Sequence, residues 1–113
     1  MHEASIIESV LETATAEARK AGAVRIERLR LRVGILSGVV PEALEFAFAA
    51  LKCDTIAAAA TLEIQTVPAT FRCLDCGTRP ELAEMMFTCP ACSGPLVVDS
   101  GGNQLELAQL EVS

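Results

Sequence analysis

Four cysteines arranged in two identical pairs constrain this chain more than any other feature of its sequence. They form the pattern Cys-x2-Cys-x12-Cys-x2-Cys and are Cys73, Cys76, Cys89 and Cys92. Four thiolates complete the tetrahedral shell that Zn2+ prefers, and each pair supplies two sulfurs from one tight turn. Because such a shell keeps no open position for a substrate, the pattern predicts a structural zinc site.

The residues next to the cysteines favour tight turns. Gly77 follows the first pair, Pro90 lies inside the second pair, and Ser93 and Gly94 follow it. The segment around the cysteines has few apolar side chains, so we expect zinc to fold it. A redox set of thiols or an iron site are alternative interpretations of the same pattern, and the short segment favours zinc over both.

Composition narrows the class of protein. The chain has 113 residues, 51% of them hydrophobic, and a net charge of -6, which suits one compact domain with a small appended module. Acidic residues outnumber basic ones by 15 to 9 and there is no Tyr or Trp, so we expect no nucleic-acid partner. No apolar run approaches the ~20 residues of a membrane span, and the N-terminus lacks the basic start of a signal peptide. We expect a cytoplasmic protein with reduced thiols and no membrane partner.

Residue periodicity predicts the secondary structure of the first half. Apolar residues at helical spacing predict an amphipathic helix over residues 4–21 and a second helix over 41–52, which opens with a proline. Residues 24–33 alternate between apolar and polar, and the apolar phase slips near Glu27 and Arg28. We therefore expect a strand with a bulge at that point.

The second half predicts further strands on either side of the cysteines. We expect strands over residues 62–67, 96–98 and 104–112, with a slip of the apolar phase in the last one, and an extended chain from Pro68 into the first cysteine pair. The predicted fold class is α+β, with two helices packed on a small three-stranded sheet and an inserted four-cysteine, zinc-ribbon-like module. The predicted domains are residues 1–69 plus 99–113, and residues 70–98.

The only histidine is residue 2, within Met1-His2-Glu3. A histidine near a terminus is commonly a solvated residue ahead of a helix. However, the Met1 amine, the His2 backbone nitrogen and the His2 imidazole Nδ1 can also form two fused, planar chelate rings around one ion. This donor set suits Ni2+ or Cu2+ better than zinc. Glu3, water or a partner would supply the fourth donor, and the sequence alone leaves both interpretations open.

Three other groups of residues have a structural and a functional interpretation. Cys53 could be a redox or metal-binding thiol, and the adjacent Met85 and Met86 could bind a soft metal ion. We instead predict that Cys53 is a small core residue and that the two methionines fill gaps in the zinc module. Three arginines occupy alternate positions of the first strand: Arg28, Arg30 and Arg32. They either bind an acidic partner or keep one face of the sheet hydrated.

No arrangement of residues predicts an enzyme. The sequence has no Gly-rich phosphate loop, no nucleophile–base motif and no metal-hydrolase motif, so no catalytic residue is proposed.

The whole chain resembles the HypA/HybF family of hydrogenase nickel-incorporation proteins. The resemblance lies in Met1-His2-Glu3 at the start, Leu31-Arg32-Val33-Gly34 and Leu36-Ser37-Gly38-Val39-Val40-Pro41-Glu42-Ala43-Leu44 in the middle, Pro68-Ala69-Thr70-Phe71-Arg72-Cys73 before the first pair, and Cys89-Pro90-Ala91-Cys92.

This resemblance implies a two-domain nickel metallochaperone. His2 would be the essential Ni2+ ligand, Met1 and Glu3 would contribute to the same site, and the four paired cysteines would hold a structural zinc. The implied partners are a HypB-type GTPase and the precursor of the hydrogenase large subunit, and some relatives also serve urease maturation. The alternative is a zinc-ribbon adaptor that transfers no metal.

Overall fold

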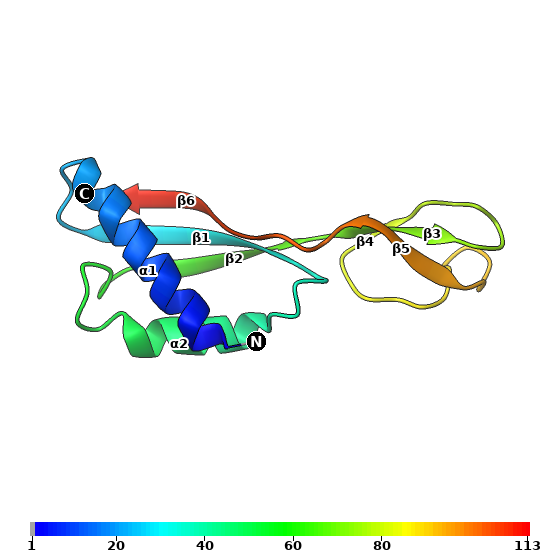
Figure 1. The fold of residues 1–113 in the computed structure, drawn as a ribbon, viewed down its shortest axis with the longest axis horizontal. Coiled ribbons are helices and arrows are strands. Elements are labelled where there is room, and N and C mark those ends of the chain that lie inside the picture. Colours follow the sequence, from blue (N-terminus) through cyan, green and yellow to red (C-terminus); the bar gives the residue numbers. More distant parts are fainter. Residues whose placement is uncertain (1) are drawn as a thin grey trace.

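The structure is a computed structural model that describes residues 2–113, so Met1 lies outside the described residues. Its elements, in chain order, are α1 (Glu3–Lys20), β1 (Ile26–Gly34), α2 (Pro41–Leu51), β2 (Thr61–Val67), β3 (Ala69–Cys73), β4 (Glu81–Leu82), β5 (Leu96–Gly101) and β6 (Leu105–Val112). The molecule is elongated, with extents of 55 × 24 × 16 Å (Figure 1). Its radius of gyration is 17.4 Å, whereas a compact chain of this length has about 13 Å.

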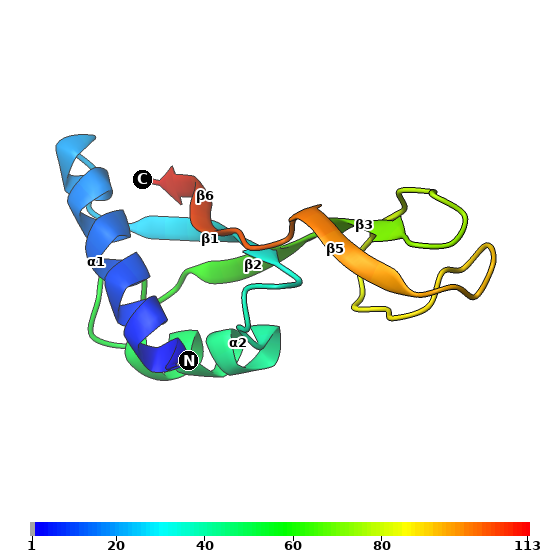
Figure 2. The same ribbon diagram turned by 45° about the vertical axis from the view of Figure 1, so that its right-hand side comes forward.

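The first sheet contains three strands in the order β2-β1-β6. β1 pairs in parallel with β2 and antiparallel with β6, so the last strand of the chain returns beside the first. The two helices lie on one face of this sheet (Figures 1 and 2). The predicted α+β class is therefore confirmed, and so is the insertion of the cysteine segment ahead of the last strand of this sheet.

The predicted bulge in the first strand is confirmed. The pairing of β1 with β6 shifts between Ile26 and Arg28, which leaves Glu27 without an opposite residue. A second shift follows, where Ala108 of β6 is the extra residue, and this matches the predicted phase slip in the last strand. Because of the first shift, Ile26, Leu29, Leu31 and Val33 of β1 all lie in the main core despite the change of apolar phase.

The main core lies between the helices and this sheet. It includes Ile7, Leu11, Ala14 and Ala18 from α1, Ile26, Leu29, Leu31 and Val33 from β1, and Leu44, Ala47 and Phe48 from α2. Phe46 of the same helix is 78% exposed. The core side of α2 takes Leu44, Ala47 and Phe48, and Phe46 lies off that side because of the helical spacing.

The opposite face of the sheet carries the three alternating arginines, which pair with glutamates of the neighbouring strands. Arg30 contacts Glu63 of β2 at 3.0 Å, and Arg32 contacts Glu106 of β6 at 3.0 Å. Arg28 lies 3.3 Å from Glu111 of β6. The side chains are 34–52% exposed, so each pair contributes at most about 1 kcal/mol. The arginines therefore have acidic partners within the chain and keep this face polar.

A second, smaller sheet contains the strands that flank the cysteines, in the order β4-β3-β5. β5 runs from Leu96 to Gly101 and is longer than the predicted strand, because its end pairs with Ala69 at the start of β3. The sequence did not predict β4, which has two residues. Beyond this sheet, the loops that carry the cysteines form the far end of the molecule (Figure 1).

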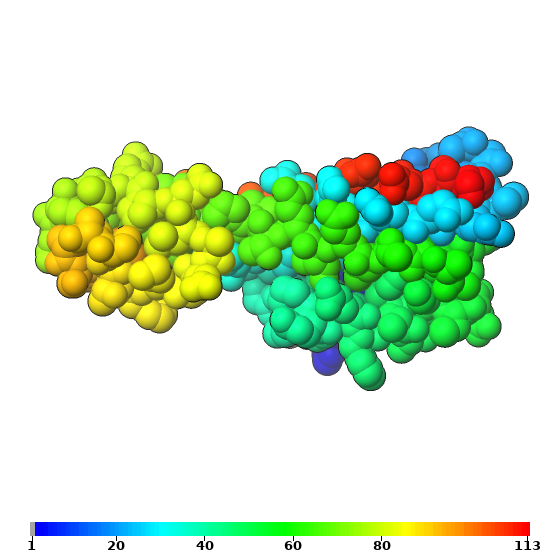
Figure 3. Space-filling model, turned by 180° about the vertical axis from the view of Figure 1, so that it is seen from behind, coloured from blue at the N-terminus to red at the C-terminus, as the bar shows by residue number. Residues whose placement is uncertain are grey.

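Two connecting segments of the chain join the first sheet to the second. β2 continues into β3 through Pro68, and β5 continues into β6 through Gly102 (Figure 1). Gly102 has a φ of +77°, and a Cβ added there would lie 2.7 Å from the Cβ of Ala69. A side chain at this position would be both strained and crowded. The space-filling view shows the resulting narrow waist between two lobes (Figure 3).

Within residues 2–113, no helix is long and apolar enough to cross a membrane.

Candidate metal centre

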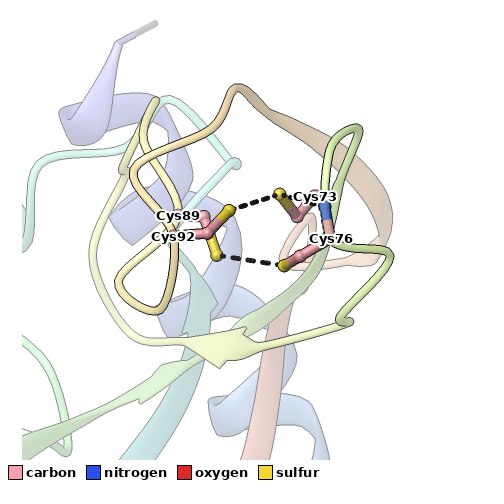
Figure 4. Close-up of side chains that lie close together, drawn as sticks. All are labelled: Cys73, Cys76, Cys89 and Cys92. Carbon is pink, nitrogen blue, oxygen red and sulfur yellow. Dashed lines mark hydrogen bonds between the residues drawn. The ribbon is translucent and has the colours of Figure 1, made fainter.

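The four paired cysteines meet at one point. Their sulfurs all lie within 4.8 Å of one another, with 3.4 Å between those of Cys73 and Cys92 and 3.8 Å between those of Cys76 and Cys89 (Figure 4). A tetrahedron with Zn–S bonds of about 2.3 Å has sulfur–sulfur edges of about 3.8 Å. The donor set and its spacing therefore fit a zinc ion.

Each cysteine pair lies on a tight backbone turn. In the first turn, the N–H of Gly77 donates to the carbonyl of Cys73 at 3.2 Å, and Gly77 has a φ of +74°. In the second turn, the N–H of Ser93 donates to the carbonyl of Cys89 at 2.8 Å, and Ser93 has a φ of +64°. Ser93 is the only non-glycine residue with a positive φ among residues 2–113. The two pairs thus use equivalent turns, and in the second a serine adopts the conformation that glycine has in the first.

Backbone N–H groups point at the sulfurs. The N–H of Cys76 donates to Cys73 Sγ, that of Ala91 to Cys89 Sγ, and that of Gly94 to Cys92 Sγ, each at 3.4 Å. Such bonds stabilise the thiolate form of cysteine, which is the form that binds metal. The loops thereby prepare the sulfurs for a cation.

The pKa values of these thiols are spread apart. Hydrogen bonds from the side chain and backbone of Thr78 lower the pKa of Cys76 to about 6. The N–H groups of Ala91 and Cys92 lower the pKa of Cys89.

Cys92 shifts in the opposite direction. The N–H of Gly94 lowers its pKa, but the neighbouring sulfurs of Cys73 and Cys76 outweigh this effect and raise it to about 12. Four sulfurs at this spacing repel one another as thiolates unless a cation neutralises them. The electrostatics of the cluster therefore favour a bound divalent ion.

The core around the cluster is small. Its buried residues are Ala69, Phe71, Cys73, Cys89 and Leu96, and two of these five are themselves candidate ligands. Ile35, Leu36, Leu82 and Met86 pack against them with partial exposure. A core of this size is too small to order the cysteine loops without a cross-link or a metal.

The N-terminal residues named as nickel donors are partly described. His2 is the N-cap of α1, with an exposed side chain that makes no capping hydrogen bond. Its carbonyl accepts the first helical hydrogen bond, from the N–H of Ile6 at 3.3 Å. Met1 lies outside the described residues. The structure thus places the histidine at an accessible helix start, and its binding to Ni2+ stays a prediction.

Glu3 has a contact that the sequence did not predict. Its carboxylate Oε2 accepts a hydrogen bond from the backbone N–H of Val40 at 3.4 Å. Val40 is the N-cap of α2, so the first residue of one helix lies at the N-terminus of the other. A negative charge there also interacts favourably with the dipole of α2.

Two sequence predictions near these sites are wrong. Cys53 is exposed rather than buried, because it follows the end of α2, and its thiol donates a hydrogen bond to the carbonyl of Ala49 at 3.6 Å. Met85 is 44% exposed, while Met86 packs against the small core as predicted.

The exposure of Cys53 leads to a prediction about thiol reactivity. In the zinc-loaded protein, one thiol per chain is expected to react rapidly with a chromogenic disulfide reagent, because Cys53 is accessible and the other four sulfurs hold the metal. Chelation of zinc should make all five thiols reactive. A Cys53→Ser variant is the control and should show no rapid phase; more than one rapid thiol in zinc-loaded protein would contradict the assignment.

One residue of the cluster escaped the sequence analysis. The hydroxyl of Thr78 lies 3.0 Å from Cys76 Sγ and 3.7 Å from Cys89 Sγ, so it contacts both cysteine pairs. A thiolate can only accept, so the hydroxyl donates to it. Threonine is common beside turns and has no spacing rule, so only the folded loop identifies this role.

A two-helix α+β domain joined to a four-thiolate centre defines a small metal-binding protein. The chain belongs to the HypA family, because the family model described as "Hydrogenase/urease nickel incorporation, metallochaperone, hypA" matches residues 1–112.

Curated relatives and solved structures agree with this membership. The chain is 42% identical to the hydrogenase maturation factor HypA of Rhizobium leguminosarum bv. viciae and 40% identical to that of Picosynechococcus, in each case over 99% of both chains. The solution structure of the Ni metallochaperone HypA from Helicobacter pylori has the same fold, with a TM-score of 0.67, 24% identity, and coverage of 99% of this chain and 97% of that one.

Proposed function

We propose that this protein carries nickel for the maturation of [NiFe]-hydrogenase. In this proposal Ni2+ is cargo that binds at Met1, His2 and Glu3, and a resident zinc held by the four paired cysteines orders the second sheet. The observation that carries the proposal is the family match over residues 1–112, which includes both the N-terminal motif and the cysteine pairs. Relatives of this family are maturation factors, so we propose no enzymatic activity.

The start of α1 suits a chelating ion. The first helical hydrogen bond is donated by Ile6, so the N–H groups of His2 and Glu3 have no partner within the helix. A backbone nitrogen without a helical bond can be deprotonated and bind Ni2+ without breaking the helix. Together with the terminal amine and the imidazole, it gives the nitrogen-rich, planar donor set that Ni2+ prefers.

The two proposed metal sites differ in how accessible the ion is to a partner. The zinc site is closed by four sulfurs, two of them buried, which suits an ion that stays. The nickel site is at an exposed chain end, where a partner can reach the ion and replace the donors. This difference supports a resident zinc and a transferable nickel.

The partners that we propose are a HypB-type GTPase and the hydrogenase large subunit precursor, with urease maturation proteins as further recipients. The proposed compartment is the cytoplasm. We propose that residues 1–69 plus 99–113 form the nickel-binding domain and that residues 70–98 form the zinc domain.

A zinc-ribbon adaptor without transferable metal is the second candidate function. The observation that favours it is the exposure of large apolar side chains in the cysteine loops, where Phe87 is 74% and Leu74 is 54% exposed. Such side chains are common at protein contacts. Direct Ni2+ titration separates the two functions, because an adaptor would not bind the ion at its N-terminus.

A blocked N-terminus tests the proposal. Adding residues ahead of Met1 removes the free amine as a donor, so Ni2+ binding is expected to weaken strongly by calorimetry while zinc content stays at one ion per chain. The matched control carries the same residues after Ser113 and should bind as the untagged protein does. Equal nickel affinity in both tagged forms would count against an N-terminal site.

X-ray absorption at the nickel edge on untagged protein should show nitrogen and oxygen donors without sulfur.

A further inference from the structure

A groove runs along the outer side of α1, where this helix passes the end of α2. Its volume is about 450 Å³, and six residues of α1 line it: Glu8, Leu11, Glu12, Thr15, Ala16 and Arg19. Leu51, the last residue of α2, also lines it. Within residues 2–113, no other element lies over this side of α1 (Figures 1 and 2). The groove is therefore open to another molecule.

The residues of α1 that line the groove are arranged symmetrically along the helix. They form pairs that lie at equal distances from the midpoint between residues 13 and 14: Glu8 with Arg19, Leu11 with Ala16, and Glu12 with Thr15. Steps of three and four residues connect them, so they share one side of the helix. When two identical helices pack antiparallel about a two-fold axis at this midpoint, each residue lies beside the other member of its pair on the second copy. The groove is therefore suited to contact with a copy of itself.

The charges of the groove have no partner among the described residues. Glu8, Glu12 and Arg19 are exposed, and none of them forms an ion pair with another of residues 2–113. By contrast, the three arginines on the open face of the sheet contact glutamates of the neighbouring strands. The charges of the groove are thus available to a second molecule, whereas those of the sheet face are neutralised within the chain.

An antiparallel second copy supplies the charges that the groove lacks. At each end of the contact, Arg19 of one copy lies beside Glu8 of the other. In the middle, the hydroxyl of Thr15 lies beside the Glu12 carboxylate of the other copy and can donate to it. A parallel pair would instead place identical charges beside each other, which is unfavourable at a contact. Antiparallel helices also have opposed dipoles, which attract.

We propose that this groove is the interface of a two-fold symmetric dimer, in which α1 of one chain packs antiparallel on α1 of a second copy and Glu8 pairs with Arg19 at both ends. The inference goes beyond the proposed nickel function and does not rest on it. The charges fix the direction and the register of the two helices more than they strengthen the contact.

The dimer is expected to be weak. Its apolar part consists of the exposed Ala16, the half-buried Leu51 and the small accessible part of Leu11. One helix face is smaller than the roughly 800 Å² per partner of a standard interface, and exposed ion pairs add little to affinity. The dimer therefore forms only as the protein concentration rises.

Sedimentation equilibrium of untagged, zinc-loaded protein over about a hundredfold range of concentration measures this association. The unaltered chain should shift from monomer towards dimer, and added salt should oppose the shift. Glu8→Arg and Arg19→Glu each place like charges at both ends of the contact, so each variant alone should associate at least about tenfold more weakly. A chain that stays monomeric at every concentration would overturn the proposal and leave the groove to a protein of another sequence.

Mixing the two variants identifies the interface. A Glu8→Arg chain carries arginine at both positions, and an Arg19→Glu chain carries glutamate at both, so a mixed pair regains two contacts between opposite charges. Equal amounts of the two should therefore form a heterodimer about as readily as the unaltered chain forms its dimer. Failure of folded variants to recover association when mixed would overturn the proposal, because a contact elsewhere on the molecule predicts no such recovery.

Glu45→Arg is the matched control. Glu45 is exposed on α2 and does not line the groove, so this change alters the net charge as Glu8→Arg does but spares the contact. Equal loss of association in this control would reveal a general effect of charge and overturn the interface.

A further variant disrupts the middle of the contact without altering either end. Thr15→Glu places a second carboxylate beside Glu12 of the other copy and should also weaken association, which gives a test independent of the two charge reversals. Circular dichroism should show the helical content of the unaltered chain in every variant, because neither Glu8 nor Arg19 has an ion pair within residues 2–113 to lose. Undiminished association in Thr15→Glu would contradict the proposed register.

Discussion

Replacing His2 with alanine is expected to abolish detectable Ni2+ binding by the untagged protein and to leave zinc content at one ion per chain. In the proposed chelate the imidazole closes the second of two fused rings, so its loss would leave an amine and one backbone nitrogen, which bind weakly. Removing a group that only hydrogen-bonds to a metal ligand already lowers metal affinity about 10- to 100-fold. Loss of a direct donor should therefore cost at least about a hundredfold.

The same change should leave the fold intact. The His2 side chain is exposed and makes no capping hydrogen bond to α1, so alanine removes no structural contact. Circular dichroism and thermal unfolding should match the unaltered protein. Glu8→Ala is the control, because Glu8 is an exposed carboxylate of α1 that lies six residues after His2. Unchanged nickel affinity in His2→Ala would remove the basis for a nickel carrier and favour the adaptor.

Replacing Cys73 with serine is expected to release zinc and unfold residues 70–98, while the domain with the two helices survives. Cys73 is only 2% exposed and belongs both to the sulfur cluster and to the small core. Three remaining thiols hold zinc much less tightly, and the other buried residues of the module are too few to order it. The main core keeps all fourteen of its buried residues.

Metal analysis and amide hydrogen exchange measure both effects. Zinc should fall well below one ion per chain, and protection should be lost in β3 and β5 but kept in α1 and β1. Cys53→Ser is the matched control, since this thiol is exposed and distant in sequence from the four ligands, and it should keep both zinc and protection. Persistence of one zinc per chain in Cys73→Ser would show that the four-thiolate assignment is wrong.

The sequence predicted the main sheet well because its strands have one buried face. On such a strand a shift of one residue moves every apolar side chain to the wrong face, so the phase slips near Glu27 and before Leu110 had to correspond to bulges. The full length of β5 and the existence of β4 were harder to predict. Both depend on pairing with β3 rather than on a pattern of their own.

Burial of single residues was predicted less well. Cys53 was predicted to be a core residue and is exposed, although it follows a helix that carries several buried apolar residues. Whether an apolar residue at the edge of a helix face is buried depends on what the rest of the chain brings to that side. Within residues 2–113 no other element covers Cys53, and a single sequence does not contain that information.

Local sequence by itself determined the chemistry of this protein. The spacing of Cys73, Cys76, Cys89 and Cys92 fixes a four-thiolate site because two residues between cysteines are what a tight turn needs. The nickel donors proposed at Met1 and His2 are likewise covalent neighbours, so their chelate could be predicted from the sequence alone.

Only the tertiary structure decided how these groups are related. It brings Thr78 to two sulfurs, the carboxylate of Glu3 to the backbone of Val40, and Leu36 to the core of the cysteine module. Each of these contacts joins residues that no periodic pattern connects, and the last two join separate chain segments. Ligand spacing is local and can be read along the chain, whereas contacts between distant segments depend on packing that exists only after folding.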